Sequence, residues 1–384
     1  MTVELRPLGV ACNLACTYCY QNPIREAGNV RARYDIEVMK QAVQKEGGPF
    51  ALFGGEPLLL PLDDLEALLA WGFEMYGGSG LQTNGVLIQD EHIDLFIRYK
   101  VGVGVSIDGP DELNDYRWAG SLERTREQTA RSEATIHRLL ASGLSPTVIV
   151  TLHRANASRE RLSRLCDWIA GLDVAGVRFL RLHLLEVESP AVRECSALSI
   201  DENLEVLMTM AELQGRLLHL RFDLFGETES LLAGQDESVS CVWRACDPLT
   251  TPAVRGIEGD GQRSNCSRTN KLGIDFVKAD APTYERYLAL YHTPYECGGC
   301  AGCRFFLFCK GQCPGTAIDG DWRNRSEDCR VWFGLFEEAE RKLLARGFSP
   351  LSAHPVRVKL EKAMLAAWAT GQNPSLKSLL EQVT

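Results

Sequence analysis

The sequence predicts an α/β protein in which a partial (β/α)6 barrel of the TIM type is followed by a small cysteine-rich domain and a helical C-terminal tail. Two observations support this prediction. Through roughly the first 190 residues, short apolar runs alternate with stretches whose apolar residues recur at helical spacing, the pattern of a parallel sheet with crossover helices. Farther along, nine of the 14 cysteines fall between residues 241 and 329, which indicates a second domain built around thiols.

The strands and helices of the barrel follow from these runs in chain order. We expect strands over residues 3–8, 49–53, 80–82, 101–107, 147–152 and 177–184. One helix should begin after an Asp35 N-cap, and further helices should cover 62–75, 90–99, 132–141 and 158–169. Right-handed crossovers between such units build an open barrel, so the chemistry should lie at the carboxyl ends of the strands.

The domain boundaries follow from the same patterns. A length of 384 residues leaves room for about two domains. The tail is expected to be helical because Phe333, Leu335, Phe336 and Ala339 recur at helical spacing. We place the barrel at 1–220, a linker at 221–240, the cysteine-rich domain at 241–335 and the helical tail at 336–384.

Composition and charge exclude several classes of partner. The net charge is −10 and no basic stripe interleaved with aromatic residues occurs, so no nucleic acid is expected as a partner. No run approaches the ~18 apolar residues of a membrane span, and the N-terminus lacks the features of a signal peptide. We therefore expect a cytoplasmic protein with no membrane partner, in which 14 cysteines indicate metal binding rather than disulfides.

Three cysteines near the N-terminus, Cys12, Cys16 and Cys19, have C-x3-C-x2-C spacing. Structural zinc sites use four protein ligands, whereas three thiolates on an iron–sulfur cluster leave one iron open to an external ligand. With Tyr18 before the last cysteine, this stretch resembles the signature of radical S-adenosylmethionine (radical SAM) enzymes. The resemblance implies that Cys12, Cys16 and Cys19 are catalytic, because in that family the open iron binds SAM and the cluster cleaves it to a 5'-deoxyadenosyl radical. The family also shares the partial barrel. Other interpretations are a zinc knuckle that lacks a ligand and a chance cluster of buried thiols.

The ends of the next three strands carry residues that this resemblance assigns to SAM. The family's GGEP motif, whose backbone meets the amino group of SAM, corresponds to Gly54, Gly55, Glu56 and Pro57. The resemblance places four further residues near the ribose and carboxylate of SAM: Thr83, Asn84, Ser106 and Asp108. Either Arg117 or Arg131 is a candidate to bind the SAM carboxylate. The other interpretation is turn chemistry, with Asp108 only shaping its loop and the arginines solvated at the surface.

The cysteines of the second domain resemble those of the SPASM domain. Fourteen residues separate Cys246 from Gly261 and four separate Gly261 from Cys266, as in that pattern, and the spacing of the later cysteines also matches. The resemblance implies two auxiliary 4Fe-4S clusters, hence three with the N-terminal one. One auxiliary cluster would use Cys241, Cys246, Cys266 and Cys313, with Cys297 as an alternative to Cys241. The other would use Cys300, Cys303, Cys309 and Cys329. A double zinc ribbon is the alternative.

Three candidate residues lie outside these sets. Cys166 follows Leu162 and Leu165 on an expected helix and is interpreted as a small buried hydrophobe. Cys195 is expected to have no role. His183, on the sixth strand, either packs in the core or faces the cavity of the barrel.

The family resemblance also implies a function, because SPASM proteins mostly modify peptides or protein side chains. Abstraction of hydrogen leaves a substrate radical, and the auxiliary clusters could accept the electron that this radical must lose. We therefore expect oxidative crosslinking, through a carbon–carbon or thioether bond, within a ribosomally made precursor peptide. A flavodoxin- or ferredoxin-type protein would donate the electrons that cleave SAM.

Other functions stay open. One is formylglycine formation as in sulfatase maturation, although Ser267 stands where that branch has an aspartate base, and a related one is dehydrogenation of a small molecule. A non-catalytic iron–sulfur electron-transfer protein is the alternative from another class, but it would not need the GGEP motif. Because Cys12 lies near the start of the chain, we expect leader recognition by the barrel, the second domain or a separate leader-binding protein.

Overall fold

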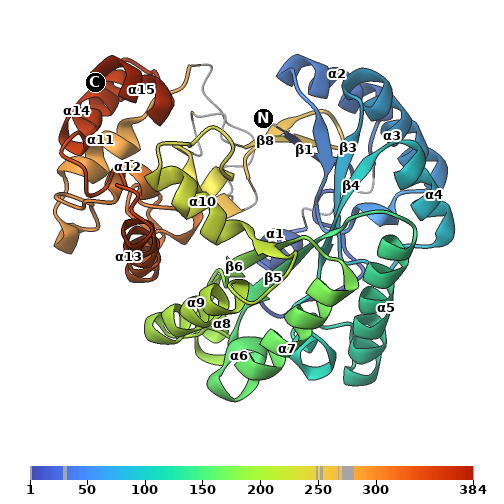
Figure 1. Cartoon of the computed structure of the whole chain (residues 1–384). Coiled ribbons are helices and arrows are strands. Elements are labelled where there is room, and N and C mark those ends of the chain that lie inside the picture. The colour runs from blue at the N-terminus through green and yellow to red at the C-terminus, as the bar shows by residue number, and fades with distance from the viewer. Residues whose placement is uncertain are drawn as a thin grey trace. The chain divides into compact units, whose positions relative to one another are not determined.

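The structure is a computed structural model that describes residues 2–28, 33–247, 250, 254–266, 268–269 and 281–383 (Figure 1). The chain divides into two compact units. The first comprises residues 1–223 and 255–267, and the second comprises residues 224–254 and 268–384. The chain therefore leaves the first unit after residue 223, returns to it for residues 255–267 and leaves it again. The expected boundaries at 220, 240 and 335 did not include this return.

The first unit is built on a nine-stranded sheet with the order β7-β6-β5-β4-β3-β2-β1-β8-β9. Neighbouring strands are parallel except for the antiparallel pair of β8 and β9. The strands are β1 (Val3–Arg6), β2 (Phe50–Leu52), β3 (Ser79–Thr83), β4 (Val101–Ser106), β5 (Thr147–Leu152), β6 (Phe179–Leu184), β7 (Arg221–Phe222), β8 (Arg255–Glu258) and β9 (Arg263–Ser264). All six expected strands are present, and the predicted α/β fold with a parallel sheet is confirmed.

Helices connect the successive parallel strands and lie on the outer side of the sheet (Figure 1). They are α1 (Asn22–Glu26), α2 (Ile36–Glu46), α3 (Leu62–Tyr76), α4 (Asp90–Arg98), α5 (Leu122–Ala141), α6 (Arg154–Ala157), α7 (Arg159–Ala175), α8 (Pro190–Cys195) and α9 (Ile200–Gln214). Asp35 caps α2 as expected, because its carboxylate accepts hydrogen bonds from two backbone N–H groups of the first turn. Helix α5 begins at Leu122, well before the expected start at residue 132.

Strands β8 and β9 form a hairpin that extends the sheet beside β1, whereas we expected this segment in the cysteine-rich domain. Strand β8 pairs with β1 from Val3 opposite Arg255 to Arg6 opposite Glu258. The Arg6 guanidinium forms an ion pair with Glu258 at 3.1 Å and donates a hydrogen bond to the backbone oxygen of Asn265 at 2.8 Å. Both charged side chains are almost fully buried, and the Arg6 guanidinium also pairs with Glu4 at 3.1 Å, so its charge is shared by two carboxylates.

The described part of the second unit is helical and has an aromatic core. Its helices are α10 (Asp223–Leu232, which begins at the end of the first unit), α11 (Glu285–His292), α12 (Phe306–Cys309), α13 (Cys329–Ala345), α14 (Arg357–Ala369) and α15 (Leu376–Val383). Phe336 stacks on Phe305 with ring centroids 5.4 Å apart and meets Trp243 edge-on at 5.3 Å. The expected linker thus contains β7 and α10, and α13 runs across the expected boundary at residue 335. The predicted helical C-terminal region is confirmed.

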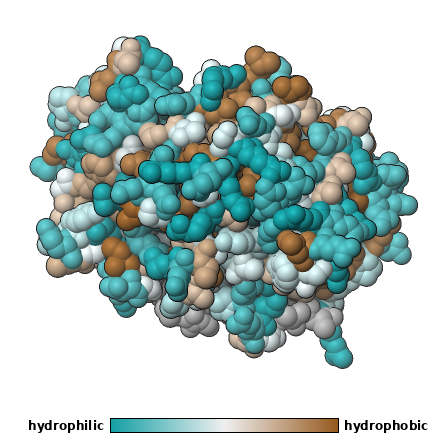
Figure 2. Space-filling model, turned by 90° about the horizontal axis from the view of Figure 1, so that it is seen from below, coloured by the Kyte–Doolittle hydropathy of each residue, from teal (hydrophilic) through white to brown (hydrophobic). Residues whose placement is uncertain are grey.

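The surface agrees with the acidic composition of the chain. On the face that Figure 2 presents, hydrophilic side chains predominate and hydrophobic ones are scattered in small groups. Among the residues that the structure describes, no helix is long and apolar enough to cross a membrane.

Candidate functional site

The loop with the three N-terminal cysteines follows β1 and lies at the carboxyl end of that strand. Its backbone is fixed to the segment after β4, because Ala15 N–H donates to the oxygen of Trp118 at 2.8 Å and Thr17 N–H to that of Tyr116 at 2.9 Å. All three thiols are partly buried. Burial raises the pKa of Cys16 to about 12, so this group would stay a neutral thiol at pH 7 unless a cation such as iron bound it.

The two glycines of the GGEP motif lie against the start of the cysteine loop. Gly54 has φ +127, and a Cβ at this position would lie 2.4 Å from the oxygen of Gly9. A Cβ on Gly55 would lie 2.1 Å from the oxygen of Ala11. These glycines are therefore required by contact with the chain's own backbone, which sequence reasoning did not anticipate. Their approach to the amino group of SAM stays a prediction.

Glu56 connects the ends of β2 and β3. Its carboxylate accepts hydrogen bonds from the Thr83 hydroxyl at 2.8 Å, from Asn84 N–H at 2.8 Å and from Leu58 N–H at 3.1 Å. Burial raises the pKa of Glu56 to about 7, although the hydrogen bonds oppose the increase. Both carboxylate oxygens are thus occupied within the chain, and only the backbone of this motif, which continues into the buried Pro57, is placed to meet a ligand.

Asn84 links β3 to the cysteine loop. Its side-chain N–H donates to the Asn13 side chain at 2.7 Å and lies 4.0 Å from the Cys12 sulfur. The same sulfur lies 3.4 Å from Leu14 N–H. Two N–H groups near one sulfur suit a thiolate ligand better than a neutral thiol, because they stabilise negative charge.

Ser106 lies near the carboxyl end of β4 and is partly exposed. Its hydroxyl accepts a hydrogen bond from the Gln82 amide on the neighbouring strand at 2.7 Å. A Cβ on Gly104 would lie 2.2 Å from the Gln82 side-chain oxygen, so this glycine makes room for the amide. Ser106 and Gln82 therefore form a polar pair near the carboxyl end of β4, and a contact of Ser106 to SAM stays a prediction.

Asp108 is fully buried and is the centre of a hydrogen-bonded group that supports the cysteine loop. Its carboxylate receives two bonds from Arg117, each 3.0 Å long, one from Thr151 N–H at 2.9 Å and one from the Tyr18 hydroxyl. The ring of His153 lies 3.3 Å away through Nε2. Burial alone would raise the pKa of Asp108, but the charge of Arg117 and the contact with His153 outweigh it and hold the pKa well below its usual range.

This geometry corrects three expectations. Asp108 shapes its loop, as one interpretation had it, because its oxygens are occupied by protein groups and do not face a ligand. Arg117 is neither solvated nor directed at an external carboxylate, since it pairs with Asp108 and its side chain is 11% exposed. Arg131 lies on the surface of α5, where it pairs with Glu127. The Tyr18 hydroxyl is likewise committed to Asp108, which leaves its ring as the part that can contact a ligand.

His153 was missed by the sequence analysis. It directly follows β5, and its ring lies between those of Tyr18 and Tyr116, with centroid distances of 5.1 and 4.8 Å. Its position just beyond a strand end was the available signal, because Asp108 likewise lies within two residues of the end of β4. His183 lies half-buried on β6.

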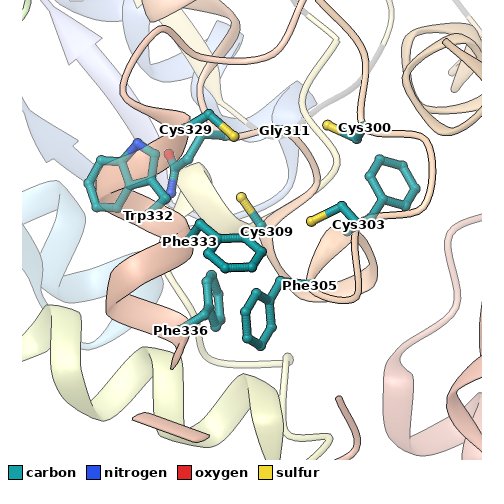
Figure 3. A pocket seen from close by; sticks show the side chains of 11 residues that line it. Cys300, Cys303, Phe305, Cys309, Gly311, Cys329, Trp332, Phe333 and Phe336 are labelled. Carbon is teal, nitrogen blue, oxygen red and sulfur yellow. The ribbon is translucent and has the colours of Figure 1, made fainter. Parts of the chain in front are cut away.

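Four cysteines of the second unit line one pocket. They are Cys300, Cys303, Cys309 and Cys329, the four that the SPASM resemblance assigns to one cluster. Figure 3 shows their sulfur atoms directed into a common space that aromatic side chains border. Burial raises the pKa of Cys300 to about 12 and that of Cys309 well above its usual range, so neutral thiols would fill this pocket without a bound cation.

The donor set of this pocket fits an iron–sulfur cluster. Each iron of a 4Fe-4S cube takes one thiolate, and four cysteines line the pocket. Four thiolates also suit zinc, so the zinc interpretation of these cysteines stays open.

The other cysteines fall into three groups. Of the expected second auxiliary set, Cys266 belongs to the first unit, and Cys241, Cys246 and Cys313 belong to the second, so their shared ligation stays a prediction. Cys297, the alternative ligand, and Cys195 are exposed. Cys166 is buried on α7, as expected for a small core residue. Ser267 lies outside the described residues.

Comparison with known sequences supports the assignment of the barrel. Residues 7–167 match the sequence model of the radical SAM superfamily. The serine-type anaerobic sulfatase-maturating enzyme of Klebsiella aerogenes is 30% identical over 211 residues, which are 52% of this chain and 50% of that protein. The cysteine-type anaerobic sulfatase-maturating enzyme of Clostridium perfringens (strain 13 / Type A) is 30% identical over 131 residues, 30% of this chain and 35% of that protein. The chain thus spans about half the length of the curated relatives it matches first.

Solved structures extend the likeness of the fold over most of the chain. Native anSMEcpe with bound AdoMet and Cp18Cys peptide superimposes with a TM-score of 0.68 at 19% identity, over 90% of this chain and 98% of that chain. SuiB of Streptococcus suis superimposes with a TM-score of 0.52 at 15% identity, over 73% of this chain and 63% of that chain. At these identities the similarity establishes the fold alone.

Proposed function

We propose that this protein uses SAM and a 4Fe-4S cluster on Cys12, Cys16 and Cys19 to oxidise a residue of a peptide or protein. The starting point is the match of residues 7–167 to the radical SAM superfamily. The observation that carries the proposal is the fixed position of the three thiols. They lie in one loop whose backbone is hydrogen-bonded to the end of β2 and to the segment after β4. The loop is therefore held in place by the chain itself before any cofactor binds.

The residues of the first unit have distinct tasks in this proposal. When bound, the cluster and SAM supply a carbon radical that abstracts a hydrogen atom from the substrate. Asn84 and the backbone N–H of Leu14 stabilise the thiolate of Cys12. Ser106 and the GGEP backbone bind polar groups of SAM. The Asp108 group would hold the Tyr18 ring and the cysteine loop in place for a bound SAM.

The second unit supplies an electron acceptor. Cys300, Cys303, Cys309 and Cys329 would hold one auxiliary cluster in their shared pocket, and the second would use Cys241, Cys246, Cys266 and Cys313. A substrate that loses a hydrogen atom becomes a radical, and it completes its oxidation by losing one more electron and a proton. An auxiliary cluster would accept that electron, and a flavodoxin- or ferredoxin-type protein would supply the electron that cleaves SAM.

The similarities support a peptide or protein as the substrate class. The matched relatives are sulfatase-maturating enzymes, and the structural neighbours include complexes with the Cp18Cys peptide and with the precursor peptide SuiA. Two finer functions fit this class. One is oxidative crosslinking of a ribosomally made peptide, and the other is formylglycine formation, which the sulfatase-maturating relatives favour but Ser267 in place of the aspartate base opposes.

The first experiment tests the radical chemistry. The protein is reconstituted with iron and sulfide without oxygen, reduced and mixed with SAM, and 5'-deoxyadenosine is measured. We expect the compound from the native sequence and none from the variant in which Cys12, Cys16 and Cys19 are replaced by Ala, which should keep about two-thirds of its iron. Production of 5'-deoxyadenosine by the variant would overturn the proposal.

The second experiment separates the two finer functions. Peptides with a sulfatase-type serine or cysteine motif and precursor peptides encoded near the gene are offered as substrates. Formylglycine is an aldehyde and reacts with a hydrazide reagent, whereas a crosslinked peptide loses hydrogen without gaining an aldehyde and yields linked fragments in tandem mass spectrometry. A hydrazide adduct would decide for formylglycine, and linked fragments would decide for crosslinking.

A further inference from the structure

Two buried N–H donors line the four-cysteine pocket and have no acceptor among the residues that the structure describes. They are Nε2 of Gln312 and Nε1 of Trp332. Gln312 is only 4% exposed, so its amide receives little hydration. Buried polar groups in folded proteins nearly always have a hydrogen-bond partner, so two unsatisfied donors at one pocket indicate that a group which binds there accepts them.

The orientation of the Gln312 amide follows from its surroundings. Its side-chain oxygen accepts a hydrogen bond from Cys313 N–H at 3.1 Å, which only an oxygen can do, so the nitrogen must lie on the other side of the amide. The backbone is fixed as well, because Gln312 N–H donates to the oxygen of Cys309 at 3.0 Å. The residue therefore lies between two cysteines of the C-x3-C segment with its donor free.

Trp332 is held at the pocket by helix α13. Cys329 begins this helix, and Trp332, Phe333 and Phe336 follow it at intervals of three, four and seven residues, which places all four on one face. Figure 3 shows this face beside the sulfur atoms, with Trp332 next to Cys329. The Trp332 ring also meets Trp243 edge-on at 5.7 Å, which limits its rotation.

The remaining lining of the pocket offers few acceptors. Apart from the four cysteines it consists of phenylalanines and Gly311, so the side-chain acceptors within reach are sulfur atoms.

We propose that Gln312 and Trp332 donate N–H···S hydrogen bonds to the cluster held by Cys300, Cys303, Cys309 and Cys329, and that these bonds raise its reduction potential. The inference rests on the proposed function, because it requires that cluster. Reduction adds one electron without making or breaking a bond, and N–H dipoles directed at sulfur stabilise the added negative charge. The two residues would thus favour transfer of an electron from the substrate radical to this cluster.

The test compares variants that remove a donor with one that does not. Trp332→Phe and Gln312→Met remove the N–H groups, whereas Phe333→Leu changes an apolar residue of the same pocket. Each is made in the full chain with Cys12, Cys16 and Cys19 replaced by Ala, so that the SAM cluster does not contribute. The potential of the auxiliary clusters is measured by redox titration with electron paramagnetic resonance, and iron is determined in the same sample.

We expect each donor variant to lower the equilibrium constant for reduction of this cluster about tenfold, which is 59 mV for one electron. Phe333→Leu should change it less than about threefold. Full iron content with no difference between the donor variants and Phe333→Leu would overturn the inference and leave the cluster assignment intact. Absence of iron from the pocket in the parent would instead overturn the cluster assignment. If Gln312→Met failed to bind the cluster, the result for Trp332→Phe would decide the question by itself, because the phenylalanine ring preserves the aromatic packing of the pocket.

Discussion

Replacing Asp108 by Asn should loosen the cysteine loop, because it leaves a buried cation without its counter-ion. The Asp108 carboxylate is fully buried and the Arg117 side chain is 11% exposed, so water can restore little of the lost charge interaction. Breaking a buried ion pair from one side costs about 3–5 kcal/mol. The whole stability of a domain is about 5–15 kcal/mol, so the first unit should remain folded but open locally far more often.

Hydrogen exchange followed by mass spectrometry measures this loss directly. Peptides that cover residues 15–19 and 104–118 should exchange about 100- to 5,000-fold faster in the Asp108→Asn variant at pH 7, the factor that corresponds to 3–5 kcal/mol. Peptides from α13 serve as an internal control and should not change. Less than a tenfold change in the first two segments would refute the view that this ion pair braces the loop.

Two further variants sharpen the measurement. Asp115→Asn breaks an ion pair with Arg126 at 3.1 Å, but this pair is exposed, so its loss should change the exchange of these segments little. The double variant Asp108→Asn with Arg117→Met removes both buried charges and should recover part of the lost protection. If the double variant lost as much protection against hydrogen exchange as Asp108→Asn alone, the bonds of Asp108 to Tyr18 and His153, rather than the charge of Arg117, would hold the loop.

The pH dependence of this effect has a defined sign. The pKa of Asp108 is lower in the folded protein than in the unfolded chain, where it is about 4. The stabilisation is therefore fully present above about pH 4 and is lost as the pH falls through the lower, folded value. The difference in exchange between the native sequence and Asp108→Asn should narrow below about pH 4.

Other predictions follow from the remaining sites. Reconstituted protein should contain about twelve irons by elemental analysis, whereas about four irons with zinc in place of the rest would contradict two auxiliary clusters. Replacing Cys309 and Cys329 by Ala should preserve 5'-deoxyadenosine formation and suppress oxidised product, and unchanged product from a variant with its other clusters intact would mean that this cluster is structural. Gly55→Ala should reduce both SAM cleavage and iron content, because its Cβ would lie 2.1 Å from the oxygen of Ala11, and normal values of both would show that the loop adapts. Since burial raises the pKa of Glu56 to about 7, protection of the ends of β2 and β3 should fall as the pH rises from about 5 to 8, and Glu56→Gln should lack this dependence.

The strands of the barrel could be predicted from the sequence because buried parallel strands are apolar runs that need no partner to be recognised. The first half of α5 could not. It buries the hydroxyl groups of Thr125 and Thr129, which donate to backbone oxygens one turn earlier, so its buried face lacks the apolar periodicity that marks a helix. The hairpin of β8 and β9 was missed because its strands are short and its partner, β1, lies about 250 residues away in the chain.

The site was predictable to the extent that chemistry is encoded in spacing. The resemblance to the SPASM pattern implied which four thiols share a pocket, namely Cys300, Cys303, Cys309 and Cys329. The pairing of Asp108 with Arg117 could not be read in this way, because a separation of nine positions says nothing about the loop that brings their charges together. His153 was missed for the same reason, since a lone histidine has no sequence partner to reveal it.

The return of the chain to the sheet at β8 has a consequence for synthesis of the protein. Strand β1 is made early. Strand β8, which covers its outer edge, and Glu258, which pairs with Arg6 from 252 residues farther along the chain, are made much later. At translation rates of about 5–20 residues per second, the ribosome needs roughly 10–50 s to produce them. During that interval the first unit presents an open strand edge, a state in which nascent chains associate with one another. A truncated gene that ends near residue 240 would make this state permanent, so the barrel should be expressed alone only if residues 255–267 are joined back to it.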